Sequence, residues 1–135
     1  MDHRFRCLAL ASLFFVSNSL HAVDEGKSLY IEGYAGDVSY APGDELQLHL
    51  SSTSAIASLS ISRVGRDRTV VHEIAKLEGL LEHPVPENAS SHGCNWPAAY
   101  AMTIPDDWKS GCYVATLILK HDDKETRSTL EFVVR

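Results

Sequence analysis

The sequence has few of the residues that cross-link a small protein or anchor it in a membrane. Its 135 residues include three cysteines, and the apolar run at residues 7–16 falls short of the roughly 20 residues that a membrane-spanning helix needs. The 12 lysines and arginines form no cluster and are outnumbered by 18 aspartates and glutamates, so we expect no binding to nucleic acid. Internal repeats, heptads and low-complexity tracts are missing too, which leaves one globular domain as the expectation.

The first 22 residues have the pattern of a secretory signal peptide. Arg4 and Arg6 precede the apolar run, and small or polar residues follow it up to Ala22. We therefore expect residues 1–22 to be removed and the mature protein, residues 23–135, to be secreted or periplasmic, with no membrane span left after cleavage. An uncleaved membrane anchor is the alternative.

Export also bears on the two cysteines that remain once Cys7 is removed. Cys94 and Cys112 form a lone pair, and in an oxidising compartment such pairs usually form a disulfide. That bridge would stabilise the fold by about 3 kcal/mol. Two free buried thiols are the alternative, because sequence spacing does not reveal whether the two Cα atoms come close enough.

Alternation of apolar and polar side chains is the dominant pattern after residue 28. It is clearest at residues 45–50, where leucines alternate with polar residues and His49 is expected to point to solvent. Similar runs occupy residues 29–34, 38–40, 56–64, 69–74, 98–104, 112–120 and 125–135. Residues 74–81 fit helical spacing as well, but Gly79 favours strand and loop. We predict an all-β fold, an immunoglobulin-like antiparallel β-sandwich of about seven strands, with a barrel as the alternative closure.

One irregular stretch, residues 83–97, concentrates the residues able to carry chemistry. The candidate binding residues in it are His83, Glu87, His92, Asn95 and Trp96. Long loops without secondary structure are uncommon unless they have a role, so we predict that this loop is a contact surface. A purely structural interpretation is also open, in which Trp96 packs over the core and Cys94 is bridged to Cys112.

Metal-binding and catalytic interpretations of the same stretch find little support in its spacing. Potential ligands such as His83, His92 and Cys94 fit no compact metal pattern, so no metal and no other cofactor is predicted. His92 has a cysteine and serines nearby, but neither an orienting acid nor a strand–turn–helix elbow accompanies them. We therefore expect no catalytic residues and no enzymatic activity from this chain.

Aromatic residues raise one more alternative, a carbohydrate-binding module, because aromatic faces stack on sugar rings. The residues concerned are Tyr30, Tyr34, Tyr40, Trp96, Tyr100 and Trp108. The ordinary interpretation is that they are core and rim residues of the sandwich.

Seven segments of the sequence resemble one known family in their order and spacing. They are residues 31–35, 39–44, 48–54, 61–65, 83–87, 90–97 and 105–113. Together they are similar to the β-sandwich segment of the N,N-dimethylformamidase large-subunit-like family, over residues 29–134. The run Ser-Ser-His-Gly-Cys-Asn-Trp-Pro at residues 90–97 is the most specific part.

The resemblance implies that the family's catalytic chemistry lies elsewhere. In that family the sandwich segment precedes a larger α/β domain, to which the mononuclear iron site and the amidase chemistry belong, and no position here matches a catalytic residue. We therefore expect a non-catalytic exported module that binds a protein partner or an extended ligand. The alternatives are an accessory subunit or detached domain of a related amidohydrolase, and a carbohydrate-binding module.

Overall fold

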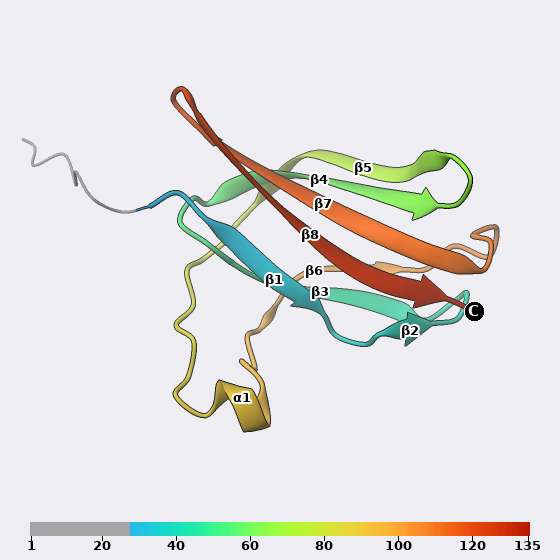
Figure 1. The fold of residues 1–135 in the computed structure, drawn as a ribbon, viewed down its shortest axis with the longest axis horizontal. Helices are drawn as coiled ribbons and strands as arrows, with labels where there is room; N and C mark the ends of the chain where they lie inside the picture. The colour runs from blue at the N-terminus through green and yellow to red at the C-terminus, as the bar shows by residue number, and fades with distance from the viewer. Residues whose placement is uncertain (1–27) are drawn as a thin grey trace, which may run out of the picture.

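Two β-sheets pack face to face across residues 28–135, the part of the chain that the computed structural model describes (Figure 1). The predicted signal peptide, residues 1–22, lies outside the described residues. The three-stranded sheet has the order β1 (Ile31–Ala35), β3 (Glu45–Ser52), β6 (Ala98–Thr103). The five-stranded sheet has the order β2 (Ser39–Tyr40), β8 (Lys124–Val134), β7 (Gly111–His121), β4 (Ile56–Val64), β5 (Arg68–Glu78). A short helix, α1 (Ala89–His92), interrupts the long connection from β5 to β6.

The predicted sandwich is confirmed, with eight strands in place of about seven. The run predicted at residues 38–40 corresponds to β2, a two-residue strand that pairs parallel to β8, whereas the other pairings are antiparallel. The stretch at residues 74–81 is strand through Glu78, and Gly79, with a φ of 76°, then ends it. Glycine tolerates this positive φ because it has no Cβ.

The core lies between the two sheets and is filled by the inward side chains of alternate positions. Leu46, Leu48 and Leu50 of β3 have no exposed surface. On β7, at the centre of the other sheet, Tyr113 stacks between the rings of Trp108 and Phe132, with centroids 4.8 and 5.7 Å away. Burial raises the pKa of Tyr113, whose hydroxyl donates to the Lys109 carbonyl oxygen at 2.7 Å. Each buried leucine contributes about 1.5–3 kcal/mol relative to an exposed one.

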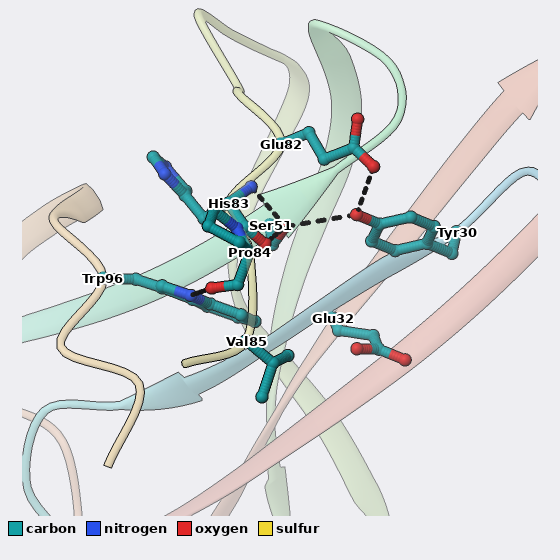
Figure 2. A pocket seen from close by; sticks show the side chains of 8 residues that line it. All are labelled: Tyr30, Glu32, Ser51, Glu82, His83, Pro84, Val85 and Trp96. Carbon is teal, nitrogen blue, oxygen red and sulfur yellow. Dashed lines mark hydrogen bonds between the residues drawn. The ribbon is translucent and has the colours of Figure 1, made fainter. Parts of the chain in front are cut away.

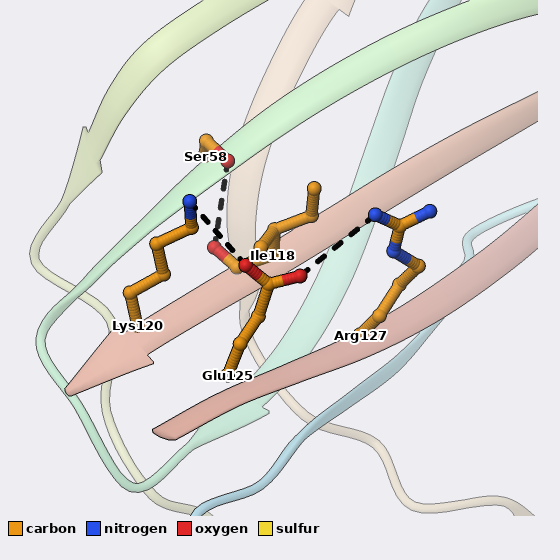
Figure 3. Close-up of polar contacts among 5 residues, drawn as sticks. All are labelled: Ser58, Ile118, Lys120, Glu125 and Arg127. Carbon is orange, nitrogen blue, oxygen red and sulfur yellow. Dashed lines mark hydrogen bonds and ion pairs between the residues drawn. The ribbon is translucent and has the colours of Figure 1, made fainter. Parts of the chain in front are cut away.

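The outer face of the five-stranded sheet is mixed, with charged side chains on β7 and β8 and the exposed valines Val64 and Val133. Across β7 and β8, Glu125 pairs with Lys120 at 3.3 Å and with Arg127 at 3.8 Å (Figure 3). These pairs are exposed, so each contributes little to stability. Within residues 28–135, no helix is long and apolar enough to cross a membrane.

The predicted disulfide is wrong, because Cys94 and Cys112 are both free thiols. Cys112 lies on the outer face of β7, in register with Val64 of β4 and Val133 of β8. Cys94 belongs to the connection that covers the outer face of the other sheet, so the sandwich stands between them. Bridging requires Cα atoms within about 7 Å.

Candidate functional site

The connection between β5 and β6, residues 79–97, folds back over the outer face of the three-stranded sheet, and we call it the covering loop (Figure 1). At its start, the Ser52 backbone N–H donates to the Leu81 carbonyl oxygen at 3.0 Å. Its two halves are joined where the Trp96 indole N–H donates to the Pro84 carbonyl oxygen at 2.9 Å. The loop is therefore fixed both to the sheet and to itself.

Ser51 is the main polar anchor of the covering loop. Its side chain lies on the outer face of β3, yet the residue is only 1 % exposed because the loop covers it. Its hydroxyl accepts a hydrogen bond from the His83 backbone N–H at 2.8 Å and donates to the His83 carbonyl oxygen at 3.1 Å. One side chain thus satisfies both backbone groups of one loop residue, which buried backbone groups require.

Trp96 is the main apolar anchor. Its ring lies against Tyr34 and His83, at centroid distances of 5.8 and 6.2 Å, and the residue is 8 % exposed. Its backbone N–H donates to the Tyr34 hydroxyl at 3.0 Å, and its carbonyl oxygen accepts from His49 Nδ1 at 2.6 Å. Trp96 therefore packs outside the sandwich core, against the outer face of the sheet.

Contrary to the prediction, His49 does not point freely into solvent. It is half-buried, and its ring stacks on Tyr34 with a centroid distance of 4.9 Å. The alternation of β3 does place it on the outer face, but the covering loop lies over that face. Because the Trp96 carbonyl oxygen can only accept a hydrogen bond, the proton of the His49 ring is assigned to Nδ1.

A groove of ≈ 500 Å³ opens between the covering loop and the edge of the sheet at β1 (Figure 2). It is lined by Tyr30, Glu32, Ser51, Glu82, His83, Pro84, Val85 and Trp96. The Tyr30 hydroxyl donates to Glu82 Oε1 at 2.9 Å and lies 3.4 Å from Ser51 Oγ, so this tyrosine is held in place from the loop side. Among residues 28–135, two carboxylates line the groove, and no lysine or arginine does.

Of the five predicted binding residues, His83 and Trp96 line the groove, whereas Glu87, His92 and Asn95 do not. His92 Nδ1 lies 2.8 Å from the Ser91 hydroxyl, and the Asn95 amide donates to the His92 carbonyl oxygen at 3.1 Å. These contacts fix the turn around α1. No three histidine, cysteine or acidic side chains within residues 28–135 come together to hold a metal ion.

Sequence reasoning missed three polar groove residues, Glu32, Ser51 and Glu82, and considered Tyr30 only for sugar stacking. Tyr30 and Glu32 alternate with the buried Ile31, so the pattern already placed them on one outer face. Ser51 lies between the runs predicted at residues 45–50 and 56–64, although β3 extends to Ser52. Their convergence depends on a loop from another part of the chain, which the local pattern does not show.

A comparison with protein families gives one match. Residues 58–135, more than half of the chain, match the family described as N,N-dimethylformamidase beta subunit-like, C-terminal. The match includes β4 to β8 and the covering loop, but neither β1 nor β3. No curated protein matches the chain. The resemblance inferred from the sequence is thereby confirmed.

Proposed function

Since the chain belongs to the family of N,N-dimethylformamidase beta subunit-like C-terminal domains, we propose that it is a non-catalytic module that binds a protein partner through the groove. The partner that fits the family best is the catalytic chain of an amidohydrolase. The observation that carries the proposal is the groove itself, which the covering loop builds on the outer face of the three-stranded sheet.

The groups in the groove suit binding better than acid–base or nucleophilic chemistry. The Ser51 hydroxyl is buried and engaged with the backbone of His83, so it is not placed to attack a substrate. The Tyr30 hydroxyl donates to Glu82. A nucleophile needs a neighbouring base within hydrogen-bond reach and a free path to the substrate.

The carbohydrate-binding alternative has less support. Sugar stacking needs an open aromatic face, but the Trp96 ring packs between Tyr34 and His83. Tyr40 and Trp108 belong to the buried core. Among the groove residues that the structure describes, this leaves Tyr30 to offer a ring face to a ligand.

Val85 provides the test of the proposed function, because it lies in the groove wall and is 63 % exposed. We expect Val85→Lys to weaken binding to the purified catalytic chain roughly tenfold or more, since the new ammonium group must be desolvated at the interface. Val38→Lys is the matched control, because Val38 is 83 % exposed and does not line the groove. Calorimetric titration measures both. Equal affinity for the two variants, or no complex with the wild-type chain, would contradict the proposal.

We also propose that the module acts outside the cytoplasm. The support is the pattern of residues 1–22, with its basic start, short apolar run and Ala22 at the end. The intact mass of the protein purified from its natural host should correspond to a chain that begins at Val23. A mass that includes Met1 would contradict this.

A further inference from the structure

We infer that the groove recognises an arginine side chain on the protein partner, an inference that rests on the function proposed above. The aromatic ring of Tyr30 and the carboxylate of Glu32 would hold the guanidinium group. The two residues stand two positions apart on the same face of the chain, which places their side chains about 7 Å apart along the strand direction.

The position of each group in the groove supports this occupant. Hydrogen bonding to Glu82 orients the Tyr30 ring, and none of the ring contacts among residues 28–135 involves Tyr30. Glu32 lies opposite Ser51 in the β1–β3 register, at the mouth of the groove. Figure 2 shows Tyr30 and Glu32 along one side of the groove, with Trp96 and Val85 across from them.

The charge of the groove favours a positively charged ligand. Within residues 28–135, the Glu32 carboxylate has no ion-pair or hydrogen-bond partner. None of the groove residues that the structure describes is a lysine or an arginine, and the chain carries a formal net charge of −6. A partner with a positive group would therefore be attracted, and its positive charge would be complementary to the groove.

The shape of the site favours arginine over lysine. A guanidinium group is planar, so it can stack on the Tyr30 ring and donate two parallel hydrogen bonds to the Glu32 carboxylate. An ammonium group is a strongly hydrated point charge and gains less from such a site.

The surroundings favour a side chain of a protein over a free guanidinium compound. Two apolar side chains of the covering loop are exposed here. Val85 lines the groove and is 63 % exposed, and Leu81, beside the groove, is 65 % exposed. A peptide chain that carries the arginine would cover these apolar side chains, whereas a small cation would leave them in water.

Three capped peptides test the inference on the full mature chain by calorimetry: acetyl-Leu-Arg-Leu-amide, its lysine analogue and its citrulline analogue, which is isosteric with arginine but neutral. We expect the arginine peptide to bind most tightly and the citrulline peptide at least roughly tenfold more weakly, because a charge-assisted bidentate pair is lost. Methylguanidinium alone should bind more weakly than the arginine peptide. Equal affinities of the arginine and citrulline peptides, or tight binding of methylguanidinium alone, would overturn the inference.

The variant Glu32→Gln tests whether the Glu32 carboxylate binds the arginine. We expect this variant to bind the arginine peptide roughly tenfold more weakly, whereas Glu131→Gln, an exposed carboxylate on β8 outside the groove, should bind it as the wild type does. The same variants separate the two proposals in titrations with the catalytic chain. If Val85→Lys disrupts that complex and Glu32→Gln does not, the arginine inference fails and the binding function stands. If neither variant weakens it, the proposed function itself fails.

Discussion

Replacing Trp96 with alanine is expected to lower the free energy of unfolding by about 3–5 kcal/mol and to release the covering loop from the sheet. The change removes a side chain that is 8 % exposed and contacts Tyr34 and His83. It also removes the indole N–H that joins the two halves of the loop at Pro84. Urea unfolding followed by circular dichroism measures the loss of stability.

Trp96→Phe is the control that separates packing from hydrogen bonding. It keeps an aromatic ring against Tyr34 but loses the bond to the Pro84 carbonyl oxygen, so we expect a loss of about 1 kcal/mol from that bond. If Trp96→Ala is as stable as the wild type, the tryptophan does not anchor the loop, and the description of the groove is wrong.

Replacing Ser51 with alanine is expected to cost about 1–3 kcal/mol, because the His83 N–H and carbonyl groups then lose their partner beneath the loop. The fold should persist, since Ser51 lies outside the core cluster between the sheets. The loss should therefore be concentrated in the covering loop. Limited proteolysis should show faster cleavage within residues 79–97, and the His83 amide should exchange faster with solvent.

Ser60→Ala serves as the matched control for Ser51→Ala. Ser60 lies on the outer face of β4, in the other sheet, and is half-buried. We expect its replacement to change stability by no more than about 0.5 kcal/mol and to leave proteolysis of the covering loop unchanged. Equal effects of the two substitutions would mean that the Ser51 hydroxyl has no special role.

The two walls of the groove differ in their relation to the family. The covering loop lies within the matched residues 58–135, whereas Tyr30 and Glu32 lie outside them. In our account, the matched part supplies the loop that closes the groove. The N-terminal strand region supplies Tyr30 and Glu32, which determine the ligand that the groove binds. Changing the specificity of the groove should therefore require changes at Tyr30 and Glu32 rather than at the tip of the loop.

The strands could be predicted from the sequence because their pattern is local. In residues 45–50, every second residue is a leucine, and all three leucines are buried. The parallel pairing of β2 with β8 could not be predicted, because it joins residues at the two ends of the described chain. Pairing between distant segments depends on tertiary packing, which periodicity does not encode.

The candidate site was only partly predictable, for the same reason. The loop was identified from its length and composition, and two of its five candidate residues, His83 and Trp96, do line the groove. The pattern also gave the correct face for His49, but not the loop that covers that face. The disulfide prediction failed because cysteine counting supplies no distance between Cys94 and Cys112.

The central claim is that the covering loop is fixed on the outer face of the three-stranded sheet, and nuclear magnetic resonance of the Trp96 indole tests it most directly. Our account predicts cross-peaks from the Trp96 ring to the rings of Tyr34 and His83, whose centroids lie 5.8 and 6.2 Å away, and slow exchange of the indole N–H that bonds to Pro84. An indole N–H that exchanges as fast as in an unfolded peptide, with no cross-peak to Tyr34, would contradict it.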